Sequence, residues 1–241
     1  MNEPCKKVIV FDLDETLGYF SQLSAIWDIL LQYTNINDIE PVFFELLDAY
    51  PVFLRPNIIG ILNFLVEQKN KNKFQKIFIY TNNSGPPSWT NFIKSYLESK
   101  TNSPIFDDCI YGYNFESEDN IRSTPEKCIT DFKKITNLPS ECRVCFIDDR
   151  VHDNMNNPDV YYIKTKPYVY KLNLDQLIEQ FVTSNISHRF EKQHLSIFLP
   201  MLYNILKNEN FQETHCTDTI NNVESNKILL QLIEFIKLPN N

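Results

Sequence analysis

The sequence predicts an α/β fold with a central parallel sheet. Five short apolar runs, rich in β-branched and aromatic residues, are typical of buried strands, and they cover residues 8–11, 76–81, 109–113, 143–148 and 159–163. The segments between them repeat apolar residues at helical spacing. Three of the runs end in polar side chains, at Asp12, Thr81 and Asp148. Because ligands of open parallel sheets bind beyond the carboxyl ends of the strands, these three ends can form one site.

The first run, Val8–Phe11, leads into an acid pair, Asp12 and Asp14. Side chains two positions apart in an extended segment share a face, so both carboxylates can project to the same side. Like charges at close range are unfavourable unless a cation or a shared proton relieves them. A hard divalent cation such as Mg²⁺ is the simplest relief. The alternative is a solvated acidic turn, which this pair alone does not exclude.

The stretch from Val8 to Leu17, Val-Ile-Val-Phe-Asp-Leu-Asp-Glu-Thr-Leu, resembles the first motif of the haloacid dehalogenase (HAD) superfamily. Its Asp-x-Asp-Glu-Thr form is similar to the C-terminal-domain phosphatase branch, whose members dephosphorylate serine in protein tails. The resemblance implies a HAD-like Rossmannoid three-layer fold and covalent catalysis. Asp12 would attack phosphorus to form an aspartyl-phosphate, and Asp14 would protonate the leaving oxygen and later activate water. Three further motifs follow in the expected order, so the resemblance covers about residues 7–165.

Residues 19–50 carry two helical apolar patterns between the first strand and the rest of the core. In the superfamily an insertion at this place is a cap over the active site, so we expect a small helical, cap-like insertion. An ordinary pair of packing helices is the alternative. Leu54-Arg55-Pro56 then resembles the Leu-Arg-Pro segment that precedes the first core helix of C-terminal-domain phosphatases. We expect Arg55 to bind substrate, and Arg55, Arg122 and Arg150 are the candidates for a locally basic crevice.

The second strand ends in Thr81-Asn82-Asn83, where the second motif of the superfamily is expected. The Thr81 hydroxyl and the backbone N–H of Asn82 can both donate to a phosphate oxygen. A helix that starts near Pro87 would add a favourable dipole for an anion. The C-terminal-domain phosphatases tend to have Thr-Ala-Ser here, so this sequence departs from their pattern.

The third motif of the superfamily is a lysine or arginine that neutralises the phosphate and the nucleophile, and we assign it to Lys127. The preceding Ser123–Glu126 has the spacing of a capping box, so we expect Lys127 in the first turn of a helix. A lysine there opposes the helix dipole and needs a compensating contact. Arg122 and Lys133 are the alternative cations, and the alternative role for Lys127 is that of an ordinary surface lysine.

The fourth motif is Asp148-Asp149, at the end of a buried strand. Adjacent side chains in a strand point apart, so we expect different tasks for the two acids. By resemblance to the C-terminal-domain phosphatases, Asp149 would bind the metal directly, and Asp148 would support it as a partner of Lys127. In other HAD branches the first acid binds the metal. The resemblance therefore implies Mg²⁺ held by Asp12, the backbone carbonyl of Asp14, and Asp148 or Asp149, and the site includes all four residues.

We expect residues 1–170 to form a HAD-like catalytic domain that contains the insertion at 19–50. Residues 171–241 are expected to form a helical extension packed on this core. The extension could brace the core, form a dimer face or dock a partner, and the oligomeric state stays open. The four histidines show no ligand spacing, so none is assigned a role.

Composition narrows the function further. A net charge of −8 without a block of Lys or Arg argues against direct binding to nucleic acid. No apolar run approaches the length of a membrane span, and no signal peptide is expected. Six scattered cysteines, including the isolated Cys142-x-x-Cys145 pair, lack a disulfide or zinc pattern. We therefore expect an intracellular, reducing location, cytoplasmic or nuclear.

The resemblance, together with these observations, implies a Mg²⁺-dependent phosphomonoester hydrolase that acts on phosphoserine or phosphothreonine in a protein or peptide. The insertion at 19–50 and the connections between Thr81 and Lys127 are short for a globular cap, which favours an open crevice. A phosphatase of small metabolites or nucleotides is one alternative. A non-catalytic HAD-like binding module is another, but such a module would normally lack one of the four acids.

Overall fold

The computed structural model describes residues 7–33, 38–115, 120–189, 192–208 and 218–239. Its centre is a five-stranded sheet in the order β3-β2-β1-β4-β5, in which every neighbouring pair is parallel. The strands are β1 (Lys7–Phe11), β2 (Lys76–Tyr80), β3 (Asp108–Ile110), β4 (Arg143–Asp148) and β5 (Val160–Lys164). The predicted α/β fold with a central parallel sheet is therefore confirmed, and its order places β1 between β2 and β4.

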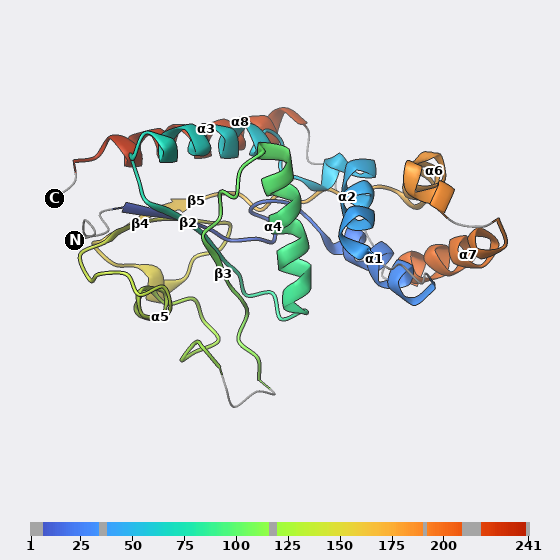
Figure 1. The fold of residues 1–241 in the computed structure, drawn as a ribbon, viewed down its shortest axis with the longest axis horizontal. Helices are drawn as coiled ribbons and strands as arrows, with labels where there is room; N and C mark the ends of the chain where they lie inside the picture. Colours follow the sequence, from blue (N-terminus) through green and yellow to red (C-terminus); the bar gives the residue numbers. More distant parts are fainter. Residues whose placement is uncertain (1–6, 34–37, 116–119, 190–191, 209–217, 240–241) are drawn as a thin grey trace. The chain divides into compact units, whose positions relative to one another are not determined.

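Helices cover both faces of this sheet, which gives three layers (Figure 1). α3 (Ile58–Asn70) and α8 (Asp218–Lys237) lie along one face, and α4 (Pro87–Thr101) packs against α3. α5 (Ile129–Ile135) covers the other face, where its Phe132 packs among Val8, Val10 and Phe146 of the strands. Alternate strand residues face opposite layers, and both sets are apolar, as expected of a parallel sheet buried on both sides.

The third strand is shorter than predicted. The apolar run indicated a strand over 109–113, but β3 ends at Ile110. The chain then packs onto the loop after β2, where the Gly112 N–H donates to the Asn83 carbonyl at 3.2 Å. A Cβ at Gly112 would lie 2.4 Å from that carbonyl oxygen, so only glycine permits this close approach.

The chain divides into two compact units. The first, which we call the sheet unit, comprises Met1–Leu17, Arg55–Tyr168 and Asp218–Asn241. The second, the helical unit, comprises Gly18–Leu54 and Val169–Thr217. Its helices are α1 (Ser21–Tyr33), α2 (Ile39–Ala49), α6 (Leu174–Thr183) and α7 (Lys192–Asn208), with short 3₁₀ segments at Pro51–Phe53 and Asn185–Arg189. A further 3₁₀ segment, Asp153–Met155, lies in the sheet unit.

The two segments of the helical unit are joined by packing and by hydrogen bonds. α1 packs against α7, and the Gln22 side-chain amide exchanges two 2.9 Å hydrogen bonds with the backbone of Leu172. The Tyr50 hydroxyl donates to the Leu177 carbonyl at 2.7 Å. α7 continues through Pro200.

This division differs from the expected boundaries of 1–170 and 171–241. The insertion at 19–50 packs with the first part of the C-terminal extension, whereas α8 returns to the sheet, where Phe235 lies 5.7 Å from the Tyr161 ring. Long-range packing, which leaves no local pattern in the sequence, sets this arrangement. Among the described helices, none combines the length and apolar character needed to cross a bilayer.

Candidate active site

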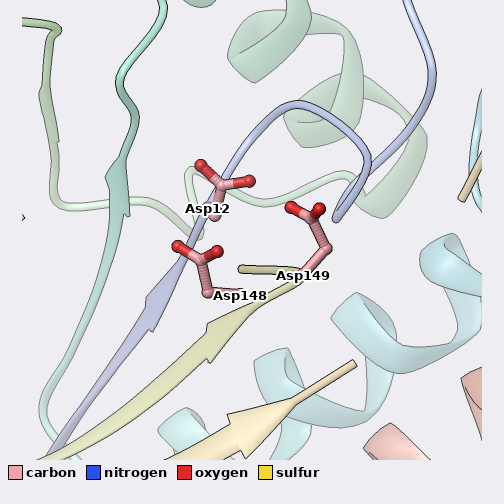
Figure 2. Close-up of side chains that lie close together, drawn as sticks. All are labelled: Asp12, Asp148 and Asp149. Atoms are coloured by element: carbon pink, nitrogen blue, oxygen red, sulfur yellow. The ribbon is translucent and has the colours of Figure 1, made fainter. Parts of the chain in front are cut away.

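Three carboxylates gather at the carboxyl ends of β1 and β4. Asp12 directly follows β1, Asp148 is the last residue of β4, and Asp149 follows it. Figure 2 shows the three side chains grouped in one place. One carboxylate oxygen of each lies within 4.8 Å of the others, and all three residues are buried. The convergence of strand ends predicted from the sequence therefore occurs here.

Lys127 provides a positive charge among these acids. Its Nζ lies 2.5 Å from Asp12 Oδ1 and 2.7 Å from Asp148 Oδ2. The lysine side chain is 1% exposed, so both ion pairs are shielded from water. The two carboxylates offset the loss of hydration that a buried ammonium group incurs.

The segment that carries Lys127 differs from the prediction of a capped helix start. α5 begins two residues after Lys127. Ser123 does not cap it there; its N–H and its hydroxyl both donate to the Asp131 carboxylate, at 2.7 Å and 2.8 Å. The N–H of Cys128 donates to the Tyr80 hydroxyl at 3.1 Å, which fixes the backbone beside Lys127. Lys127 therefore lies on an irregular segment just before α5, not in the first turn of the helix.

The two alternative cations lie elsewhere. Arg122 is buried and braces the loop after β2, since its guanidinium donates to the Thr81 carbonyl at 3.2 Å and to Asn82 Oδ1 at 2.9 Å. Lys133 lies 3.2 Å from Asp159. Neither residue lines the pocket that contains the acids. Geometry thus favours Lys127 as the cation of the site.

Burial and mutual repulsion shift the pKa values of the acids. Burial raises the pKa of Asp12 to about 7, with Lys127 opposing and Asp148 adding to the rise. Burial and the charge of Asp148 also raise the pKa of Asp149. For Asp148, burial is outweighed by hydrogen bonds from His152 and Lys127, which hold its pKa below the usual value. An additional cation would lower the cost of keeping Asp12 and Asp149 ionised.

The donor set fits a hard divalent metal, because buried carboxylates that repel one another are its preferred ligands. Both oxygens of the Asp148 carboxylate accept hydrogen bonds from other protein groups. Its Oδ2 accepts from Lys127, and its Oδ1 accepts from the Arg150 N–H at 2.7 Å. The Asp149 carboxylate accepts from the Thr16 hydroxyl at the long distance of 3.4 Å. Asp149 is therefore freer than Asp148 to bind a metal directly, as the resemblance implies.

Asp14 and Thr81 line the same pocket as the three acids. The Asn83 side-chain amide donates to Asp14 Oδ2 at 2.9 Å, and burial raises the pKa of Asp14. The Asn83 backbone N–H donates to Thr81 Oγ1 at 2.9 Å, so the Thr81 hydroxyl can still donate its own proton. Asn82 also lines the pocket. Asn83 was not assigned a role from the sequence, although it is part of the expected second motif.

Arg55, which we expected to bind substrate, is not among the residues that line this pocket. It is 2% exposed and donates to backbone carbonyls, to Thr16 at 2.5 Å, Glu15 at 2.6 Å and Lys166 at 2.9 Å. Glu15 has a left-handed backbone with φ of 60°, a conformation that costs a non-glycine residue roughly 1–2 kcal/mol. Arg55 therefore holds the strained turn that follows Asp14.

Three residues near the pocket complete the comparison with the sequence. Arg150 and His152 both line it. His152 is buried, with Nε2 at 3.3 Å from Asp148 Oδ2 and Nδ1 at 3.4 Å from Glu126 Oε2. In the sequence, the only indication that His152 belongs to the site is its position four residues after Asp148. Asp153, the residue after His152, is exposed and does not line the pocket.

Comparison with known families agrees with this geometry. The family model described as NIF, NLI interacting factor-like phosphatase, matches residues 7–194. This range contains all four segments that resemble the HAD motifs, as well as both segments of the helical unit up to α7. A search of curated proteins finds no match. The chain therefore belongs to the NLI interacting factor-like phosphatases, a C-terminal-domain phosphatase family of the HAD superfamily.

Proposed function

We propose that this phosphatase hydrolyses phosphomonoesters through an aspartyl-phosphate on Asp12, with Mg²⁺, and that its substrate is a phosphorylated protein or peptide. The proposal rests on the convergence of Asp12, Asp14, Thr81 and Lys127 on one pocket. A nucleophile, an acid, a hydroxyl donor and a fixed cation are the parts that this reaction needs.

In the first step the Asp12 carboxylate attacks phosphorus, and the bond from phosphorus to the ester oxygen breaks. Asp14 gives its proton to that leaving oxygen, and burial, which raises the pKa of Asp14, favours the protonated form that this step needs. Asn83, at 2.9 Å, holds the Asp14 carboxyl in place. Lys127 and Thr81 stabilise negative charge on the transferring oxygens.

In the second step a water molecule attacks phosphorus and the bond to Asp12 breaks. The Asp14 carboxylate accepts the proton of that water, which restores both acids. Mg²⁺ bound by Asp12 and Asp149, with Asp148 supporting and the Asp14 carbonyl as a further ligand, would reduce repulsion between the anionic nucleophile and the anionic phosphate. Phosphate monoester hydrolysis is among the slowest uncatalysed reactions, so several such contributions are required.

The size of the pocket supports a protein or peptide substrate. The pocket within the sheet unit has a volume of about 180 Å³. Pockets that enclose a drug-sized ligand usually hold about 300–1,000 Å³. The pocket therefore accommodates a phosphoryl group and little more, so the rest of the substrate extends beyond these residues. Arg150, which lines the pocket and is exposed, can contact that remainder.

The test is hydrolysis of an aryl phosphate, a set of phosphoserine and phosphothreonine peptides, and a set of sugar and nucleotide monophosphates. Each is measured with Mg²⁺ and with a chelator, on the parent enzyme and on a folded Asp12→Asn variant. We expect activity only with Mg²⁺, no turnover by the variant, and higher kcat/KM for peptides. A tenfold preference for small phosphates would contradict the peptide substrate, and full activity of the variant would exclude Asp12 as the nucleophile.

The intermediate is tested separately. With a ³²P-labelled substrate and rapid acid quenching, the parent enzyme should retain label in a bond that hydroxylamine cleaves, as an acyl phosphate does. The same experiment is made with the Asp14→Asn variant. If neither the parent enzyme nor this variant retains label, the result would argue against the covalent step.

A further inference from the structure

A groove with the opposite charge character from the whole protein lies in the sheet unit, away from the active site. It has a volume of about 710 Å³ and lies between the C-terminal ends of α3 and α8, which run side by side on one face of the sheet (Figure 1). Lys7, the first residue of β1, lies at its base. The groove is thus at the amino ends of the strands, whereas Asp12 and Asp148 are at the carboxyl ends.

The charged residues that line this groove are all lysines: Lys7, Lys71, Lys73 and Lys237. Arg143 is adjacent, because its guanidinium donates to the carbonyl of Pro239, which also lines the groove. The chain carries a net charge of −8, so this cluster reverses the overall sign locally.

The exposed lysines of the groove are largely free of acidic partners. Within the described ranges, neither Lys73 nor Lys237 pairs with a carboxylate, and Lys71 has only a solvent-exposed contact of 3.9 Å with Glu67. Such exposed pairs contribute little. The groove therefore has positive charges that can pair with an external anion.

Lys7 has a different role. It is 2% exposed and donates to the Ile236 carbonyl at 3.0 Å and to the Leu238 carbonyl, so it fixes the end of α8 as one wall of the groove. Burial, followed by the charges of Arg143 and Lys73, lowers the pKa of Lys7, which shows that positive charges converge here. The carbonyls at the end of α8 attract the Lys7 ammonium and explain its position. The Lys73 side chain, in contrast, donates to no described carbonyl.

Apolar side chains form the remainder of the lining. Phe64 and Ile233 are partly exposed, and Leu238 is 37% exposed. A small inorganic anion would leave this surface uncovered. A peptide with acidic side chains and an apolar side chain would satisfy both parts, since its carboxylates can reach the lysines while the apolar side chain covers Phe64 and Ile233.

We propose that this groove binds an acidic peptide segment of a partner protein, with an apolar side chain of that segment against α3 and α8. The site is distinct from the catalytic pocket. Five-residue strands separate the two ends of the sheet by roughly 17 Å, so the groove does not contact the reacting atoms. The inference is independent of the proposed substrate, since it requires only the groove and its charge.

The experiment measures fluorescence anisotropy of the full-length protein with a short labelled peptide that contains Asp, Glu and two Leu. The groove variant is Lys71→Glu/Lys73→Glu, in which both residues are exposed. The control is Lys100→Glu/Lys134→Glu, which makes the same charge change at two exposed positions outside the groove. Circular dichroism and hydrolysis of a small aryl phosphate confirm that each variant is folded.

We expect the groove variant to bind the peptide about tenfold more weakly, the control to bind it as the parent does, and raised salt to weaken binding. Replacing the two Leu by Ser should also weaken binding. Equal weakening by both double variants would show non-specific attraction and overturn the proposal. Binding that is unaffected by the Leu replacement, or tripolyphosphate that competes as well as the peptide, would show a simple anion site and would also overturn it.

Discussion

Replacement of Asp12 by Asn should make the metal-free protein more stable at alkaline pH while it removes activity. The pKa of Asp12 is raised from 3.8 to about 7, chiefly by burial. Between these values the folded protein holds a proton that the unfolded chain has released. The free energy of unfolding therefore falls as pH rises through this window. Asn has a similar shape and does not titrate, so the variant should lack this fall.

The size of the effect follows from the shift. Each pH unit inside the window corresponds to about 1.4 kcal/mol. A rise from about pH 5 to about pH 8 includes roughly two units below the folded-state pKa, so the parent should lose about 3 kcal/mol relative to Asp12→Asn. Any difference in packing that is common to both pH values cancels in this comparison.

The assay is urea unfolding, followed by tryptophan fluorescence in the presence of a chelator, at both pH values. Asp153→Asn is the matched control because it removes an exposed carboxylate. Saturating Mg²⁺ should reduce the difference between parent and Asp12→Asn, since a bound cation favours the ionised carboxylate. If that difference is the same at both pH values without metal, burial does not raise the pKa of Asp12 and the reasoning fails.

Three further predictions concern residues around the pocket. Lys127→Met should lower kcat/KM by about 100-fold or more, because it removes the buried cation, whereas Lys133→Met should retain most activity; similar values would refute this role. Asn83→Leu should lose more activity on an alkyl phosphate than on an aryl phosphate, since only the poor leaving group depends on a positioned Asp14. Equal losses on both substrates would contradict it. Arg55→Met should lower the free energy of unfolding by about 3 kcal/mol or more, because three carbonyls lose their donor; an unchanged urea midpoint would show that the turn does not need it.

The sheet and its site-bearing ends could be predicted because their signals are local. A buried strand in a parallel sheet is a short apolar run, and β1, β2, β4 and β5 all occur where such runs stand. The acids could be predicted in the same way, because a carboxylate directly after such a run lies at the carboxyl end of its strand. β3 was predicted too long because Tyr111 and Tyr113 continue the apolar pattern after the ladder has ended at Ile110.

The features that the sequence does not reveal are contacts between residues far apart in the chain. Arg55 lies within a motif-like segment, but the sequence does not reveal that its guanidinium donates to the carbonyls of Glu15, Thr16 and Lys166. Ser123 has capping-box spacing, yet the Asp131 carboxylate competes for it. Packing of residues 19–50 with 169–217 likewise depends on contacts across more than a hundred residues, such as those between Gln22 and Leu172.

The interleaving of the two units has a consequence for biosynthesis. The chain leaves the sheet unit after Leu17, returns at Arg55, leaves again after Tyr168 and returns at Asp218. During synthesis, α1 and α2 are therefore made before α6 and α7, which complete their unit. Likewise, β4 and β5 are made before α8, which packs on them. Neither unit can complete its core until most of the chain has emerged. Apolar residues of the nascent chain, such as Trp27 and Phe43, thus lack their native packing partners during that interval, and a chain that ends before α8 would leave β4 and β5 without the helix that covers them.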